Sequence, residues 1–175
     1  DVKSLITEEV ELKDYIEIYG DMRKHGSIAS ILKYPDEMSI ERVVTIEGAS
    51  FKAGNGKIGI IGAGNYTSST VIPALKKADA TIKYIASAGG LNAKILAKKA
   101  GAECATSDYY EILNDNEVGM VIITTRHNLH AKIVLETLRS GKSVFVEKPL
   151  CLNKEELAEI KEVYENAPKG VTLTV

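Results

Sequence analysis

The feature that most limits the fold is a regular alternation, from Lys57 to Val175, of apolar strand-like runs with amphipathic helical stretches. The run at residues 119–125, GMVIITT, is apolar almost throughout, which is typical of a strand covered on both faces. Strands that alternate with helices pair in parallel through right-handed crossovers. The sequence therefore predicts an α/β fold with a doubly wound parallel sheet.

The expected elements follow one another without long interruptions. Helix ends are indicated by Gly101 and Gly141, and Asn153 with Glu156 resembles a capping box that opens a helix with Leu157, Ile160 and Tyr164 on one face. Pro73 predicts a kink in the first helix or a start near Thr70. Strands are predicted at 57–61, 81–86, 103–106, 119–125, 144–147 and 171–175, and helices at 68–77, 92–100, 109–113 and about 128–140.

Residues 1–46 do not continue this rhythm. SLIT, an amphipathic stretch with Leu12, Tyr15, Ile16 and Tyr19, and SIASILKYP predict a strand, a helix and a strand. Residues 47–56, EGASFKAGNG, contain three glycines and predict a linker. A segment of about 46 residues is short for a core of its own. We therefore expect residues 1–46 to be the tail of a neighbouring domain whose body lies upstream of Asp1, and residues 57–175 to form the sheet domain.

The charge balance argues against several kinds of partner. With 22 basic and 24 acidic residues, the net charge of -2 predicts neither nucleic-acid nor membrane binding. No apolar run approaches the ~18 residues of a membrane span. Cys104 and Cys151 have no paired spacing and are expected to be reduced, packed thiols of a cytoplasmic protein. His127 and His130 lack a third ligand at matching spacing, so no metal site is expected.

A glycine loop, GAGNYT at residues 62–67, joins the first strand of this region to its helix, the context in which such loops bind dinucleotides. Gly62 permits the tight turn, and Gly64 and Asn65 would hold a pyrophosphate at the helix N-terminus. Thr67 replaces the third glycine, so we expect looser packing of helix on strand. A turn without a ligand and an S-adenosylmethionine methyltransferase are the alternatives.

The second strand ends in Ala86, Ser87 and Ala88, where a ribose-binding acid would be expected. The missing acid removes the repulsion that excludes a 2′-phosphate. However, no arginine stands beside this position to bind a 2′-phosphate, and the nearest base is Lys94. The choice between NAD and NADP therefore stays open.

The strand at 144–147 ends in a charged turn formed by Glu147, Lys148 and Pro149. Ligands of parallel sheets bind beyond the carboxyl ends of the strands, so we expect this turn to face the cleft. A lysine beside a substrate hydroxyl stabilises a developing alkoxide, and proline fixes the backbone next to it, with a cis peptide as one option. Lys148 is the predicted catalytic residue; the alternative is an exposed, charge-neutral turn.

Residues 56–175 resemble the dinucleotide domain of the Gfo/Idh/MocA oxidoreductases, through IGIIGAGNY and VIITTRHNLHAKIVLETLRSGKSVFVEKPL. The resemblance implies a Rossmann fold, a Lys148 that reaches the active site, and a Glu147 that helps to hold the nicotinamide ribose. It also implies that most substrate contacts and an acid/base histidine lie in a second domain. The family's loop T-P-N-x-x-H is matched at Thr125 and His130 and departs at Arg126 and His127. The predicted cofactor contacts are Gly62, Gly64, Asn65, Tyr66, Ser87, Thr124, Thr125, Arg126, His127, His130, Glu147, Lys148 and Pro149.

Residues 1–46 resemble the C-terminal end of a zinc-type, medium-chain alcohol dehydrogenase, through SLIT and LKDYIEIYGDMRKHGSIASILKYP. Together the two resemblances imply a fragment of a two-module dehydrogenase whose metal ligands lie upstream.

The predicted function is that of an NAD(P)-binding domain of an oxidoreductase, which transfers hydride between a nicotinamide cofactor and an alcohol or sugar-like hydroxyl. The expected partner is a small-molecule substrate, and homo-oligomerisation stays open. Because the loop departs from the family at Arg126 and His127, a non-catalytic nucleotide-binding sensor or scaffold is the alternative.

Overall fold

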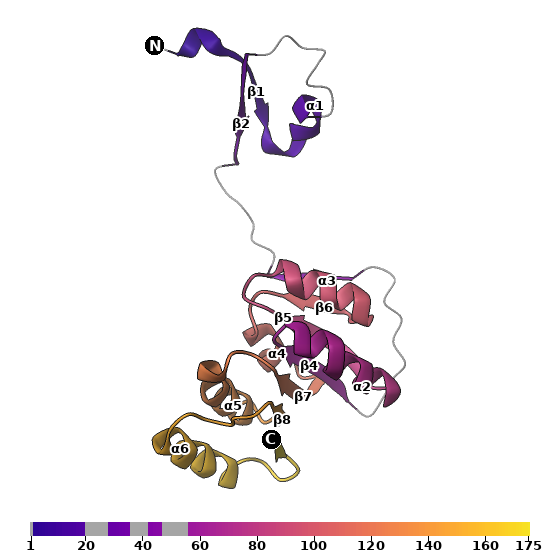
Figure 1. Ribbon diagram of the computed structural model, residues 1–175, viewed down its shortest axis with the longest axis vertical. Coiled ribbons are helices and arrows are strands. Elements are labelled where there is room, and N and C mark those ends of the chain that lie inside the picture. Colours follow the sequence, from indigo (N-terminus) through magenta and orange to yellow (C-terminus); the bar gives the residue numbers. More distant parts are fainter. Residues whose placement is uncertain (1, 20–27, 36–41, 47–55) are drawn as a thin grey trace. The chain divides into compact units, whose positions relative to one another are not determined.

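The computed structural model describes residues 2–19, 28–35, 42–46 and 56–175, and these form two units, Asp1–Ile40 and Glu41–Val175 (Figure 1). The linker predicted at 47–56 lies outside the described residues except for Gly56. The predicted division at residues 46 and 57 stays a proposal. The second unit already includes Val43–Thr45, which pairs with its sheet.

The first unit is a small two-stranded parallel sheet, β1 (Ile6–Glu11) beside β2 (Ala29–Lys33), with the short helix α1 (Tyr15–Tyr19) between them in sequence. This is the predicted order of strand, helix and strand. β1 begins two residues later than predicted, because Lys3–Leu5 forms a 3-10 turn. None of the described residues of this unit is fully buried, which agrees with a segment too short to form its own core.

The second unit contains a seven-stranded sheet in the order β3-β6-β5-β4-β7-β8-β9. Six parallel strands carry the predicted alternation, and in chain order they form the 3-2-1-4-5-6 arrangement of a Rossmann fold. The prediction of an α/β, doubly wound parallel sheet is therefore confirmed. These strands are β4 (Lys57–Ile61), β5 (Thr81–Ala86), β6 (Cys104–Thr106), β7 (Val118–Ile123), β8 (Ser143–Val146) and β9 (Leu173–Thr174).

The seventh strand, β3 (Val43–Thr45), was not predicted from the sequence. It pairs antiparallel with β6 at the edge of the sheet, with Val44 opposite Ala105. Three residues are too few to show the alternation by which a strand is recognised.

Helices cover both faces of the sheet (Figure 1), and each face has its own apolar core between the helices and the strands. One core joins α2 (Ile72–Lys77) and α3 (Leu91–Ala100) to alternate strand residues such as Ile60 and Ile122. The other joins α4 (Tyr110–Asn114), α5 (His130–Arg139) and α6 (Lys154–Glu165) to the intervening residues such as Ile61 and Ile123. The central strands are thus buried on both faces, as their continuous apolar runs predict.

Helix details partly differ from the predictions. A π-helical turn at Thr67–Val71 precedes α2, and the Ile72 N–H donates to the Thr67 carbonyl five residues back. Pro73 follows in the first turn of α2, so the predicted start near Thr70 is wrong. The Asn153 cap is confirmed, because its side chain accepts the Glu156 N–H at 2.8 Å. Leu157, Ile160 and Tyr164 share one face of α6, as their spacing predicts, but only Ile160 of the three is buried, because Leu157 and Tyr164 are 49% and 39% exposed.

An ion network lies beside the first residues of β4 and β7. Lys83 of β5 contacts Asp115 and Glu117, and the Tyr84 hydroxyl donates to Asp115 at 2.9 Å. Burial acts to lower the pKa of Lys83, but its hydrogen bonds to both carboxylates outweigh burial and raise that pKa. Burial acts to raise the pKa of Asp115, and the hydrogen bond from Lys83 outweighs it, so that pKa is lowered. The hydrogen bonds from Lys83 and Lys57 lower the pKa of Glu117.

Acidification is expected to weaken the fold through this network. The pKa values of Asp115 and Glu117 lie below their ordinary 3.8 and 4.5, so their stabilisation is complete above those values and is lost as the pH falls below them. Asp115→Asn is expected to reduce the free energy of unfolding by roughly 1–3 kcal/mol at neutral pH. It is also expected to flatten the acid decline of the thermal midpoint. Thermal melts at several pH values test this, with Glu162→Gln on α6 as the control; an unchanged acid decline in Asp115→Asn would contradict it.

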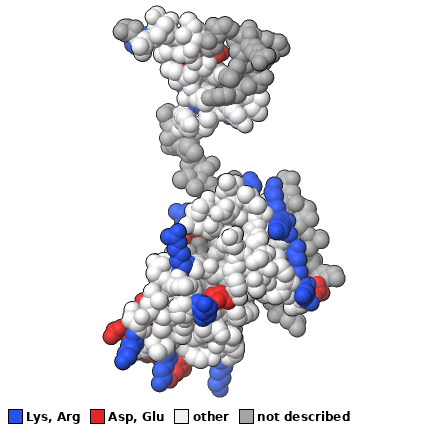
Figure 2. All heavy atoms as spheres, viewed as in Figure 1, with Lys and Arg blue, Asp and Glu red and all other residues white. Residues whose placement is uncertain are grey.

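The surface of the second unit carries both signs of charge. Basic side chains lie along α3 and the end of α2, and acidic and basic side chains mix elsewhere on the face seen in Figure 2. In the described part of the chain, no helix has the length and apolar character needed to cross a membrane. No cluster of three or more potential metal-ligating side chains is found within the described ranges.

Candidate functional site

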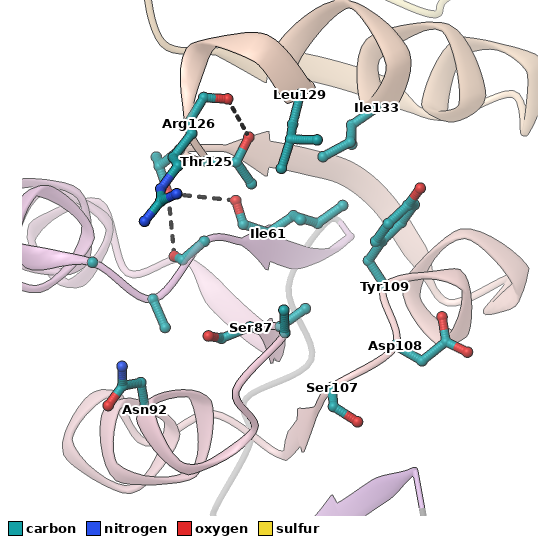
Figure 3. A pocket seen from close by; sticks show the side chains of 16 residues that line it. Ile61, Ser87, Asn92, Ser107, Asp108, Tyr109, Thr125, Arg126, Leu129 and Ile133 are labelled. Atoms are coloured by element: carbon teal, nitrogen blue, oxygen red, sulfur yellow. Dashed lines mark hydrogen bonds between the residues drawn. The ribbon is translucent and has the colours of Figure 1, made fainter.

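The main cavity opens at the carboxyl ends of β4, β5 and β7. At β4 the strand order reverses, because β5 and β6 follow on one side of β4 and β7 and β8 on the other. This is the place where open α/β sheets bind their ligands. The cavity has a volume of about 770 Å³ and lies between the glycine loop, the loops after β5 and β6, and the start of α5 (Figure 3). It is lined by Ile61, Gly62, Ala63, Gly64, Ala86, Ser87, Ala88, Asn92, Ser107, Asp108, Tyr109, Thr124, Thr125, Arg126, Leu129 and Ile133.

The two glycines of the loop have different reasons to be glycine. Gly62 has φ +121°, and a Cβ there would lie 2.5 Å from Thr124 Oγ1 and 2.8 Å from the Thr124 carbonyl. Its N–H donates to the Ala86 carbonyl at 2.9 Å, which ties β4 to the end of β5. A Cβ on Gly64 would meet no protein atom within 4 Å. Nothing in the fold therefore requires glycine at 64, whereas a ligand lying against the backbone would.

Thr67 strengthens the loop instead of loosening it. Its side chain is fully buried, and its hydroxyl donates to the Gly62 carbonyl at 2.8 Å and lies 2.7 Å from the Thr124 hydroxyl. The expected looser packing at the position of the third glycine is wrong, because the threonine side chain fills the space with hydrogen bonds. The first backbone N–H groups of the helix that begins at Asn65 remain without intrahelical partners and suit an anion.

The far side of the cavity is formed by the ends of β5 and β6. Ser87 lies where an acid is common in this type of fold, and its position beside Ala86 and Ala88 leaves that edge uncharged. The only acid in the lining, Asp108, is neutralised by Arg42 at 2.9 Å. The cleft therefore offers hydroxyl groups and backbone to a ligand and little negative charge to repel phosphate. These features fit a dinucleotide.

A second cavity of about 200 Å³ adjoins the first, since Thr124 and Thr125 line both. It brings together seven of the residues predicted from the sequence: Tyr66, Thr124, Thr125, His127, His130, Glu147 and Lys148. They come from the glycine-loop helix, the loop after β7 and the turn after β8.

The turn after β8 is held in place by backbone contacts. The Glu147 N–H donates to the Ile123 carbonyl at 3.0 Å, and the Lys148–Pro149 peptide bond is cis. Lys148 is exposed, and Glu147 is half-buried. A hydrogen bond to the Glu147 carboxylate, with burial as a smaller cause, raises the pKa of the Tyr66 hydroxyl. Tyr66, on the glycine-loop helix, lines the same cavity as Glu147 and Lys148.

His130 bridges the two loops that line the smaller cavity. Its side chain is fully buried. Its Nδ1 lies 2.8 Å from the Pro149 carbonyl oxygen, and its Nε2 lies 3.1 Å from the Thr125 carbonyl oxygen. Both ring nitrogens are thus occupied by backbone carbonyls, so the structure gives His130 a supporting position beneath the site.

Removing the His130 imidazole is expected to destabilise the fold. His130→Ala leaves a buried cavity and two unbridged carbonyls, so we expect the free energy of unfolding to fall by about 2–4 kcal/mol. His127→Ala is the matched control, because His127 is exposed and contacts His130 only edge to face. The control is expected to change stability by less than about 0.5 kcal/mol. Urea denaturation measures both variants, and equal effects would contradict the assignment.

Two of the predicted contacts lie outside both cavities: Asn65 is exposed at the helix start, and Pro149 contacts the site only through His130. Several lining residues were missed, among them Asn92, Ser107 and Leu129. Asp108 and Tyr109 also line the cavity. Asp108 accepts the Tyr110 N–H at 3.0 Å, and the Tyr109 hydroxyl donates to Glu136 at 2.6 Å. Their place after β6 was the available signal.

The family described as the Gfo/Idh/MocA oxidoreductase family, with an NAD-binding Rossmann fold, matches residues 56–175. The chain belongs to this family. The match covers the whole sheet except β3 and includes both cavities. It does not extend to residues 1–55, so it lends no support to the predicted resemblance of residues 1–46 to an alcohol dehydrogenase.

Relatives of the chain include sugar- and inositol-metabolising enzymes. A myo-inositol 2-dehydrogenase from Thermotoga maritima is 32% identical over 115 residues, which cover 65% of this chain and 33% of that enzyme. A 3-ketoreductase from Actinomadura kijaniata in complex with NADP superposes with a TM-score of 0.63 at 26% identity, over 69% of this chain and 38% of that one.

A levoglucosan dehydrogenase in complex with NADH and L-sorbose gives a TM-score of 0.61 at 26% identity, over 68% of this chain and 34% of that one. The chain spans about a third or less of the length of the curated relatives it matches.

Proposed function

We propose that the Glu41–Val175 unit binds NAD or NADP across the two cavities, as part of an enzyme that transfers hydride to or from a sugar or alcohol. The observation that carries the proposal is that the two cavities share two lining residues. An open backbone position at Gly64 lies in one, Lys148 lies in the other, and Thr124 and Thr125 line both. One extended ligand with an anionic middle and a reactive end suits this arrangement.

In this proposal each part of the site has one task. Gly62, Gly64 and Asn65 present the backbone to the pyrophosphate, and Ser87 faces the adenine ribose. Thr124, Thr125 and the loop that carries Arg126 and His127 lie along the middle of the ligand. Glu147 would contact the nicotinamide ribose, and the contacts of His130 with the Pro149 and Thr125 carbonyls would hold the two loops in place.

The bound nicotinamide would supply the hydride chemistry, and the protein would manage one proton. Lys148 lies at the solvent-facing edge of the smaller cavity, on a turn fixed by the Glu147 N–H. Its ammonium would stabilise the negative charge that develops on the substrate oxygen when the hydroxyl loses its proton. The substrate would be a polyol or sugar, as for the inositol and levoglucosan dehydrogenases among the relatives.

A turnover assay on the full-length protein tests this function. Purified protein is incubated with NAD⁺ or NADP⁺ and with inositols, hexoses and anhydrosugars in turn, and the reduced nicotinamide is followed by absorbance. The proposal expects reduction with at least one substrate of this class.

The rival proposal is a sensor or scaffold that holds the dinucleotide without turnover, suggested by Arg126 and His127 in place of the family's proline and asparagine. Tight dinucleotide binding combined with no reduction across the whole substrate panel would favour the sensor. Membership of the Gfo/Idh/MocA family leaves no support for the methyltransferase alternative.

Residues 1–46 stay proposed as the tail of a zinc-type alcohol dehydrogenase, and the chain as part of a two-module enzyme. The parallel β1 and β2 pair supports only a strand–helix–strand segment. A cytoplasmic location and a homo-oligomeric state are likewise predictions that the described residues do not test.

A further inference from the structure

Arg126 stands where the family's loop carries proline, and its charge has no counterpart in the cleft. The residue lines the main cavity, and no described residue pairs with its guanidinium. The other charged residue in the lining, Asp108, is already paired with Arg42 at 2.9 Å. The cavity therefore contains one uncompensated positive charge, although the whole chain is slightly acidic.

The position of Arg126 faces the glycine loop. Figure 3 shows its side chain extending from the loop after β7 toward the end of β4, and Gly62 and Gly64 line the same cavity. The loop that carries it is fixed, because the Arg126 carbonyl accepts the Leu129 N–H at 3.0 Å and His130 holds the Thr125 carbonyl. The arginine is therefore an exposed cation on a loop whose backbone is fixed, and it lines the same cavity as the Gly64 backbone, which is open to an anion.

We propose that Arg126 binds the pyrophosphate of the dinucleotide from the β7 side of the cleft, across from the glycine loop. This assignment rests on the proposed function. A guanidinium forms paired, charge-assisted hydrogen bonds with phosphate oxygens, which a proline at this position cannot supply. The departure of the loop from the family pattern then strengthens dinucleotide binding at this point.

The local backbone allows a clean test. Arg126 has φ -69° and ψ 147°, which proline adopts without rearrangement. Arg126→Pro therefore installs the family's residue and removes the charge, and Arg126→Gln removes the charge alone. Arg126→Lys keeps a charge. Arg139→Gln is the matched control, because Arg139 is an exposed arginine that pairs with Glu159 at 2.7 Å and lines neither cavity.

Dissociation constants of the 175-residue chain are measured by calorimetry for NADH, NADPH, ADP and adenosine. Arg126→Gln and Arg126→Pro are expected to weaken ADP and the preferred dinucleotide by about tenfold or more, the usual effect of losing a charged hydrogen bond. Adenosine, which has no phosphate, is expected to change by less than about twofold, and Arg139→Gln to leave all ligands unchanged. Lysine at 126 is expected to restore part of the ADP affinity.

Three results would overturn the proposal: unchanged ADP affinity in Arg126→Gln, an equal loss for adenosine, or no recovery with lysine. An equal loss for adenosine would place the arginine on the base instead. Thermal midpoints of all variants show whether a loss of affinity comes from a folding defect. A folding defect would weaken ADP and adenosine alike, and Arg126→Lys would not be expected to restore ADP binding alone. If the unaltered chain binds none of the phosphate-bearing ligands, the proposed function fails together with this assignment. If it binds them and Arg126→Gln binds equally well, only this assignment fails.

Discussion

Under the proposed hydride-transfer function, replacing Lys148 by alanine is expected to reduce the turnover of the protein by about 10²–10⁴-fold, the range of a lost acid/base or charge-stabilising group. The dissociation constant of the dinucleotide is expected to change by less than about threefold. The reason is the location of the side chain: Lys148 lines the smaller cavity and not the main one, which Gly62 and Gly64 line, and its turn is anchored by its neighbour's backbone. Stopped-flow or steady-state assays give turnover, and fluorescence titration gives affinity.

Lys154→Ala is the control for this experiment, because Lys154 is an exposed lysine at the start of α6 that lines neither cavity. It is expected to behave as the unaltered enzyme. Equal losses of turnover and affinity in Lys148→Ala would make the lysine a binding residue only. Unchanged turnover would return the turn to the alternative of an exposed, charge-neutral feature.

Gly62→Ala is expected to have the largest effect on folding. The alanine would need a φ of +121°, and its Cβ would press on the backbone and side chain of Thr124. Backbone strain and overpacking together are expected to reduce the free energy of unfolding by about 2–4 kcal/mol and to abolish dinucleotide binding.

Gly101→Ala separates the two causes, because Gly101 also has a positive φ, +76°, but its Cβ would meet nothing within 4 Å. Strain alone is expected to cost it about 1 kcal/mol. Chemical denaturation measures both variants. A cost for Gly62→Ala no larger than for Gly101→Ala would show that the contact with Thr124 yields easily.

Much of the sheet domain could be predicted because its central strands are rich in apolar residues and alternate regularly with helices. β4, β5 and β7 are largely buried, and β4 and β7 consist mainly of apolar residues, whereas β5 also contains Lys83 and Tyr84. β3 escaped because its three residues take their structure from pairing with β6, a contact between segments about 60 residues apart. The burial of the apolar face of α6 could not be predicted, because periodicity shows which residues share a face and only the fold decides how much of that face is covered.

The site residues that could be predicted are those whose residue type and place in the sequence point to a single role. Gly62, Lys148 and the loop after β7 follow from strand ends and glycine geometry, and the structure brings them into adjoining cavities. Thr67 and His130 were read incompletely, since their hydrogen bonds to Gly62, Pro149 and Thr125 exist only in the folded chain. Ser107 and Asp108 were missed as lining residues, although their place directly after the predicted strand 103–106 puts them at the carboxyl edge of the sheet.

The central claim is that the cleft above Gly64 is a dinucleotide site, and Gly64→Ala tests it most directly. The added methyl group would touch no protein atom, so the thermal midpoint is expected to stay unchanged. Titration with NADH and NADPH is expected to show binding of at least one by the unaltered chain, and a loss of at least about tenfold in Gly64→Ala, because the methyl group occupies the place of the pyrophosphate. Equal affinity in the two proteins, or no binding of either dinucleotide by the unaltered chain, would contradict the account.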